Sequence, residues 1–234
     1  MKSMTGLRVA SHSRAARAAR LCCVLACIGS ADLLAGCATS EEMVKKSEGY
    51  YQEGVASLSG DRQKAFVSFQ RSVQLNPNNK QARYALGHVY ALQGKLSQAE
   101  DEFRAAIDID EDYSEAYTYL GQVLSNQNRL EEAIKSYRRA LTNPLYSTPD
   151  LARFHLGRAL AQTGDLPGAV EALEDVLTVS PASFPPAMTH LELGRVYYKL
   201  GYKAKAREVL KKVTTLDKGG EYAAAATELL ARLK

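Results

Sequence analysis

Cysteine is missing from most of this chain. Residues 38–234 contain none, and the four that exist all lie near the amino terminus, at Cys22, Cys23, Cys27 and Cys37. The greater part of the chain therefore cannot form an internal disulfide or a metal site built from thiolates.

The chain also lacks a long apolar run and, beyond its first residues, an excess of either charge. The apolar run Leu21–Ile28 is far shorter than the roughly 20 residues that a membrane-spanning helix needs. The net charge of +4 arises in residues 1–36, because the 30 basic and 26 acidic residues of the whole chain become 25 and 25 without them. We also find no platform of aromatic and basic residues, so nothing favours a nucleic-acid partner.

No pattern of a catalytic or metal site is present. Asp108, Asp110 and Asp112 have the opening spacing of a calcium loop, but Tyr113 and Tyr119 stand where that loop needs glycine and glutamate. Each of three histidines stands alone in its segment, without a second ligand at i+3 or i+4: His88, His155 and His190. Nucleophile motifs and phosphate-binding glycine loops are likewise missing. We therefore expect no enzymatic activity, no cofactor and no metal.

What the chain does contain is a repeat of about 34 residues, seen most clearly in Gln81–Ala106. Two landmarks carry the period. Glycines inside a helical pattern recur after 33, 34, 36 and 37 residues, at Gly54, Gly87, Gly121, Gly157 and Gly194. Alanines of a following helix recur after 34, 34, 36 and 37 residues, at Ala65, Ala99, Ala133, Ala169 and Ala206. Such a period, with one helix pair in each copy, is typical of a solenoid.

A glycine inside a helix costs roughly 1 kcal/mol relative to alanine. Five such glycines therefore indicate five places where two helices cross closely, and we expect the alanines to face them there. The next large apolar position of the pattern is filled by Phe103, Tyr137, Leu173 and Leu210.

These features resemble the tetratricopeptide repeat over nearly the whole of residues 47–234. The resemblance implies an all-α protein, a right-handed superhelical solenoid of five helix pairs followed by a C-terminal capping helix. We place the pairs at about 47–79, 80–113, 114–149, 150–186 and 187–218, and the capping helix at 221–233. A capping helix of this kind would cover the apolar face left open at the end of the array.

The amino terminus resembles a bacterial lipoprotein signal. Basic residues up to Arg20 precede the apolar run, and Leu33-Leu34-Ala35-Gly36-Cys37 follows it. The resemblance implies a signal peptide over residues 1–36, lipidation of Cys37, and a lipidated polar tether over residues 37–46.

Because Ala38 rather than aspartate follows the cysteine, the same resemblance implies outer-membrane attachment facing the periplasm. An ordinary secretory signal cut elsewhere, or an apolar amino-terminal helix, are the alternatives, and either Met1 or Met4 could be the start. Several acyl chains would give durable attachment, since each buried methylene contributes about 0.8 kcal/mol.

In tetratricopeptide arrays the first helix of each pair lines a concave groove that binds peptides. Projecting one face of these helices predicts a partner-binding groove that mixes aromatic residues with arginine, the types enriched at interface centres. The implied ligand is a peptide with apolar anchors rather than a free carboxy terminus. The residues predicted to line the groove are Tyr84, His88, Thr118, Gln122, Phe154, Arg158, Leu191, Arg195 and Tyr198. The alternative is that some of them pack inside the solenoid.

Two longer connections interrupt the repeat, at Asn143–Asp150 (NPLYSTPD) and Pro181–Ala187 (PASFPPA). Their prolines limit backbone freedom, so each is expected to hold a set shape. Together with the lipoprotein signal, they resemble the type IV pilus biogenesis lipoproteins, the pilotins of the pilus secretin. Some relatives carry a cysteine pair where this chain has Ser125 and Ala159, so that disulfide is absent here.

This second resemblance implies a non-enzymatic assembly factor. It would bind secretin subunits, bring them to the outer membrane through its acyl chains, and promote their multimerisation, without nucleic acid or a small-molecule substrate. The alternatives are a lipoprotein of the outer-membrane β-barrel assembly machinery and a scaffold that regulates cell-wall enzymes.

Charge is uneven along the repeats. Residues 100–115 hold eight acidic side chains against Arg104 alone, and residues 195–212 hold seven basic ones against Glu208. A solvated helix face is the ordinary explanation of both stretches, and steering of a charged partner is the alternative.

Overall fold

The computed structural model describes residues 40–179, 182 and 185–233. In those residues all regular secondary structure is helical and no strand occurs. The predicted signal peptide and Cys37 lie outside them. A helix over residues 40–57 comes first. It is followed by α2 (Arg62–Leu75), α3 (Lys80–Leu92), α4 (Leu96–Ile109), α5 (Ser114–Asn126), α6 (Leu130–Ala140), α7 (Pro149–Thr163), α8 (Leu166–Val176), α9 (Pro186–Lys199), α10 (Lys203–Leu216) and α11 (Glu221–Arg232).

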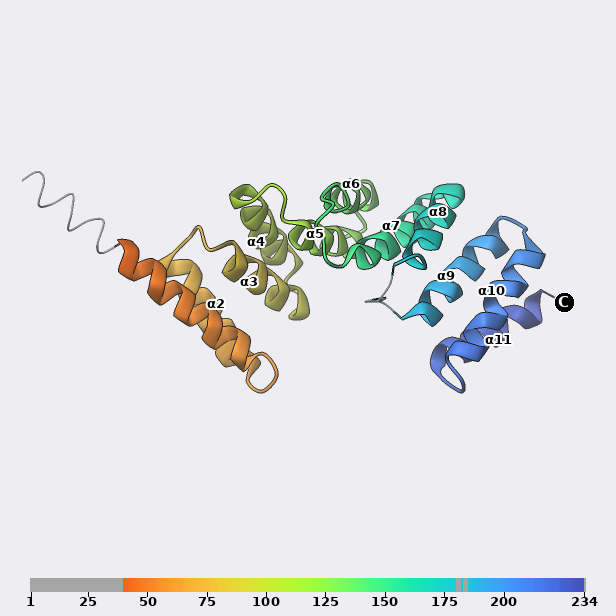
Figure 1. The fold of residues 1–234 in the computed structure, drawn as a ribbon, viewed down its shortest axis with the longest axis horizontal. Helices are drawn as coiled ribbons and strands as arrows, with labels where there is room; N and C mark the ends of the chain where they lie inside the picture. Colours follow the sequence, from red (N-terminus) through yellow and green to blue (C-terminus); the bar gives the residue numbers. More distant parts are fainter. Residues whose placement is uncertain (1–39, 180–181, 183–184, 234) are drawn as a thin grey trace, which may run out of the picture.

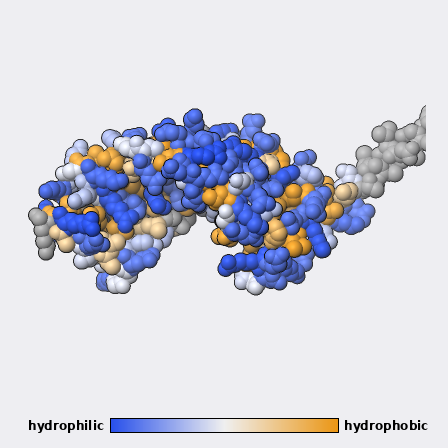
Figure 2. Space-filling model, turned by 180° about the vertical axis from the view of Figure 1, so that it is seen from behind, coloured by the Kyte–Doolittle hydropathy of each residue, from blue (hydrophilic) through white to orange (hydrophobic). Residues whose placement is uncertain are grey.

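Consecutive helices pair, and the pairs stack into the predicted solenoid. In Figure 1 the stack forms an arch, with α5 and α7 on its inner side and α6 and α8 on its outer side. The first helix of the described chain and α11 lie at opposite ends. Figure 2 shows the same arch from behind, with the two ends lying lower than the middle repeats and hollow space between them.

The repeated glycines lie against the large apolar side chain of the following helix. A Cβ built on Gly121 would lie 2.5 Å from a ring carbon of Tyr137, which is far inside normal contact. The equivalent distances are 2.5 Å for Gly54 to Phe69, 3.0 Å for Gly87 to Phe103, 2.7 Å for Gly157 to Leu173 and 2.6 Å for Gly194 to Leu210. The predicted close crossings are therefore present in all five pairs.

The repeated alanines lie buried on the second helix of each pair. All five are fully buried, at 0% exposure, and the atom nearest to a new Cβ on each glycine belongs to the large residue four positions after the alanine. At Gly157 the backbone oxygen of Ala169 also lies close, at 3.3 Å, and at Gly194 the Cγ2 atom of Val209 lies at 3.4 Å. The alanines thus let the two helices approach, and the aromatic or leucine side chain fills the space over the glycine.

Residues 40–46, which belong to the predicted tether over residues 37–46, are helical and continue into the first helix. Two ion pairs at i,i+4 spacing support this turn, because Lys45 Nζ lies 2.8 Å from Glu41 Oε1 and Lys46 Nζ lies 2.8 Å from Glu42 Oε1. Ser47 then fixes the helix to its partner, since its hydroxyl donates to the backbone oxygen of Ser72 at 2.9 Å. The helical array therefore begins earlier than residue 47.

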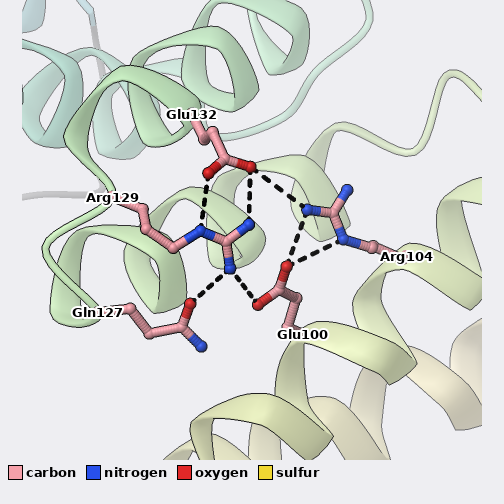
Figure 3. Close-up of polar contacts among 5 residues, drawn as sticks. All are labelled: Glu100, Arg104, Gln127, Arg129 and Glu132. Carbon is pink, nitrogen blue, oxygen red and sulfur yellow. Dashed lines mark hydrogen bonds and ion pairs between the residues drawn. The ribbon is translucent and has the colours of Figure 1, made fainter.

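A network of charged groups holds the second and third repeats together (Figure 3). Arg129, just before α6, contacts Glu100 on α4 at 2.7 Å and Glu132 on α6 at 2.7 Å. Arg104 adds a second contact to Glu100 at 2.8 Å. Burial raises the pKa of Glu100, but hydrogen bonds from Arg104 and Arg129 outweigh it, so the net pKa is lowered. The network thus favours an ionised, paired Glu100 between two repeats.

Candidate binding groove

A cavity of about 560 Å³ lies at the C-terminal end, between α7, α9 and α11. We call it the C-terminal groove. Its walls come from three helices and comprise Arg158, Ala161, Gln162, Glu192, Arg195, Val196, Tyr198, Lys199, Ala225, Glu228, Leu229 and Arg232.

Each wall is one stripe of a helix. On α9 the lining residues include Glu192, Arg195, Val196 and Lys199, which follow i, i+3, i+4 and i+7 spacing. On α11 the set from Ala225 to Arg232 has the same spacing. Helix α11 therefore stands where the first helix of a sixth pair would stand, and it both closes the core and forms a wall of the groove.

The groove combines apolar and charged surface. Val196 forms part of its floor and is 2% exposed, whereas Tyr198 is 40% exposed at its edge. Two arginines are paired within their own helices, Arg195 with Glu192 at 2.5 Å and Arg232 with Glu228 at 2.6 Å.

Two further cations line the groove, Arg158 and Lys199. Across residues 40–179, 182 and 185–233, the ion pairs found include neither of them. The guanidinium of Arg158 instead lies over the ring of Phe154, 5.8 Å from its centroid. The groove therefore has four basic and two acidic side chains, and both acids are already engaged.

A smaller cavity of about 140 Å³ adjoins the groove between α5, α6 and α7. Arg158 and Gln162 line both cavities, so the two form one surface along the inner helices. His155 faces the smaller cavity and stacks on Tyr137, with 5.9 Å between ring centroids. Burial, followed by the nearby positive charge of Arg158, lowers the pKa of His155 to about 4.

The structure brings together four of the nine residues predicted for the groove. Arg158, Arg195 and Tyr198 line the C-terminal groove, and Gln122 lines the adjoining cavity. Three others are buried and cannot contact a partner there, which corrects their assignment: Thr118 at 0%, Phe154 at 1% and Leu191 at 4% exposure.

Thr118 has a different role. Its hydroxyl donates to the backbone oxygen of Ser114 at 2.9 Å and lies 2.9 Å from the hydroxyl of Tyr146. Tyr146 belongs to the first long connection and is 7% exposed. The side chain of Asn143 also donates to the backbone oxygen of Asp112 at 3.1 Å. The first long connection is thus held against α5, while part of the second, including Pro181 and Phe184, lies outside the described residues.

Tyr84 and His88 belong to an aromatic cluster in the second and third repeats. The ring of Tyr119 on α5 lies 5.6 Å from that of Tyr84 and 4.9 Å from that of His88, both on α3. Phe103 also packs on Tyr84, at 5.9 Å. Both residues are half-buried, so their contacts join the second and third repeats, and neither lines the C-terminal groove.

Nothing in the described residues forms a group of three or more histidine, cysteine, aspartate or glutamate side chains that could hold a metal ion. Among the same residues, no helix is long and apolar enough to cross a membrane.

Family models match the chain in overlapping segments from residue 56 to residue 221. Models described as tetratricopeptide repeat match residues 56–105 and residues 110–147, 118–187 and 156–221, and a model described as TPR repeat matches residues 87–128. The chain is a tetratricopeptide-repeat protein. This class of repeat serves as a scaffold that binds other proteins, and its families are generally not enzymes. A search of curated protein sequences finds no match.

Several solved structures share this tetratricopeptide fold. PilF of Pseudomonas aeruginosa is 21% identical, with a TM-score of 0.68 over 82% of this chain and 90% of PilF. PilW, a widely conserved type IV pilus biogenesis factor, is 25% identical, with a TM-score of 0.68 over 80% of this chain and 91% of PilW. YrrB, a tetratricopeptide protein with an unusual peptide-binding site, is 23% identical, with a TM-score of 0.62 over 76% of this chain and 90% of YrrB.

Sequence reasoning missed the wall that α11 contributes to this tetratricopeptide groove. The sequence pattern predicts only a capping role for residues 221–233 and does not assign Glu228, Leu229 or Arg232 to a groove. The repeat period itself would have found them. Counting one period of about 34 residues on from Gly194 reaches α11, where a further first helix is due.

His155 makes the stability of this tetratricopeptide protein depend on pH. A histidine with a lowered pKa is protonated in the unfolded chain before it is protonated in the folded one. Stability therefore falls as the pH drops from the unfolded value of 6.5 toward the folded value of about 4. At pH 5, protonation of this histidine in the unfolded chain lowers the free energy of unfolding by about 2 kcal/mol.

We expect His155→Gln to remove this part of the pH dependence. Urea unfolding of both proteins at pH 7.5 and pH 5 measures it, and the other histidines serve as an internal control because both proteins retain them. An equal fall in stability for the two proteins would contradict the assignment.

Proposed function

We propose that this chain is a lipid-anchored assembly factor of the type IV pilus. It binds secretin subunits in the periplasm and promotes their localisation to the outer membrane and their multimerisation. The observation that carries the proposal is the likeness to PilW, a type IV pilus biogenesis factor, over 80% of this chain. The likeness to PilF shows the shared fold.

Two further features support the proposal. The Leu33-Leu34-Ala35-Gly36-Cys37 segment resembles a lipoprotein signal and would supply the membrane attachment through Cys37. The connection Asn143–Asp150 interrupts the repeat where the pilotin resemblance expects it. Tyr146 holds it against α5, and Asn143 holds it against the turn that precedes α5.

Replacing Cys37 by serine tests the proposal. We expect a folded protein that no longer fractionates with the outer membrane, because the acyl chains that retain it cannot be attached. Outer-membrane secretin multimers should then fall to the level of a strain without the protein. Immunoblots of unheated membrane fractions measure them, and circular dichroism checks the fold.

Cys27→Ser is the matched control, because it alters the apolar run and leaves the Leu33–Cys37 segment intact. Unchanged multimers in the Cys37→Ser strain would refute the mechanism. A pull-down from periplasmic extract decides between this proposal and the alternatives: it recovers secretin, barrel-assembly subunits or cell-wall enzymes.

A further inference from the structure

The side chains that line the C-terminal groove have an excess of positive charge, with four basic groups and two acidic ones. Glu192 and Glu228 are each held by an arginine of their own helix, at 2.5 Å and 2.6 Å. Arg158 and Lys199 are exposed and face the groove from α7 and α9. In the absence of a partner carboxylate, these two cations are solvated, and a ligand with matching negative charge would pair with them.

The floor between these cations is apolar. Val196 and Leu229 approach from α9 and α11, and small alanines, Ala161 and Ala225, leave room between the helices. At the edge, the half-exposed ring of Tyr198 offers the kind of rigid aromatic surface that is enriched at interface centres. At the C-terminal end, which lies at the left of Figure 2, apolar and polar surface alternate.

We infer that the C-terminal groove binds an acidic segment of a protein partner that carries apolar anchor residues. The apolar residues would lie between α9 and α11, and the acidic ones would pair with Arg158 and Lys199. Where that partner is the secretin, the inference rests on the proposed function. The chemistry of the groove itself does not depend on it.

The positive charge of the groove also argues against the amino-terminal segment of this chain as its ligand. The amino-terminal segment, residues 1–36, has five basic side chains and one acidic side chain. It would be repelled by the excess of basic groups in the groove, so a separate acidic partner is the better match.

Three short synthetic peptides of equal length test the inference by fluorescence anisotropy with the full chain. One combines aspartate with leucine, the second replaces each aspartate by lysine, and the third keeps aspartate but replaces leucine by serine. We expect only the first to bind measurably, and its affinity to fall with added salt, since paired charges at a groove edge are screened.

The charge reversal Arg158→Glu combined with Lys199→Glu is the decisive variant. We expect it to weaken binding of the aspartate–leucine peptide about tenfold or more, and to create binding of the lysine–leucine peptide. Misfolding cannot produce such an exchange of preference. Lys203→Glu is the matched control, because Lys203 is exposed on α10 and does not line the groove.

Three outcomes would overturn the inference: equal binding of the acidic and basic peptides, an equal effect of Lys203→Glu, or a dimer in sedimentation that the double reversal dissociates. The last would assign the groove to a second copy of this chain. If the peptides behave as expected but the reversed protein still recovers secretin normally, the groove chemistry stands and the secretin is bound elsewhere. If secretin is never recovered, the proposed function fails independently.

Discussion

Gly121→Ala is expected to destabilise the protein by up to about 2 kcal/mol, although alanine is the better helix former. The new Cβ would lie 2.5 Å from the ring of Tyr137, which is 1% exposed and has its hydroxyl 3.3 Å from Ser125 Oγ. Moving the ring away from the new Cβ would therefore disturb its packing and its contact with Ser125. Overpacking of this kind costs about 1–3 kcal/mol, which exceeds the roughly 1 kcal/mol gained in helix propensity.

A larger side chain should have a larger effect, and Gly121→Leu is expected to cost about 3 kcal/mol or more. Urea unfolding followed by circular dichroism measures both variants. Gly49→Ala is the control, since Gly49 is helical and exposed and a Cβ there meets nothing within 4 Å. That change should stabilise the protein by up to about 1 kcal/mol. If both alanine variants were stabilised alike, the close contact at Gly121 would not limit packing.

Phe154→Ala is expected to lower the free energy of unfolding by about 3–5 kcal/mol, as removal of a fully buried aromatic ring does. The ring is 1% exposed and packs edge-on against His155, with 5.5 Å between ring centroids. The same change at Tyr198, which is 40% exposed, should alter stability by no more than about 0.5 kcal/mol.

Urea unfolding of the two variants, combined with binding of the aspartate–leucine peptide, measures the difference. Tyr198→Ala should weaken peptide binding while leaving the fold intact. If the Phe154→Ala protein were stable and had lost only peptide binding, the result would show that Phe154 lines the groove.

The fold was predictable because its physical requirement is local and repeated. Each pair needs a residue without a side chain where a ring or leucine crosses, and Gly87 over Phe103 meets this need as Gly121 over Tyr137 does. What remained hidden was which side chain fills the contact. Glycine and alanine both mark close approach, and only the three-dimensional packing shows that the aromatic or leucine residue lies over the glycine.

The groove was predictable only in part. Projection onto a helix gives the direction of a side chain around the axis, but not how deeply the neighbouring helices cover that position along it. Phe154 and Arg158 share one face of α7, yet the first is buried and the second exposed. The projection places Thr118 in the groove, but its hydroxyl contacts that of Tyr146, 28 residues later in the chain. No local sequence pattern contains this contact.

The arch places its two ends far apart. The helix over residues 40–57 begins at one end, and α11 with the C-terminal groove lies at the other (Figure 1). The packed repeats between them form a stiff arm, in contrast to a flexible linker, whose reach fluctuates. An anchor at Cys37 would therefore act as the pivot of this arm. The number of repeats, rather than the length of a tether, would then set how far from the membrane a bound segment can be held.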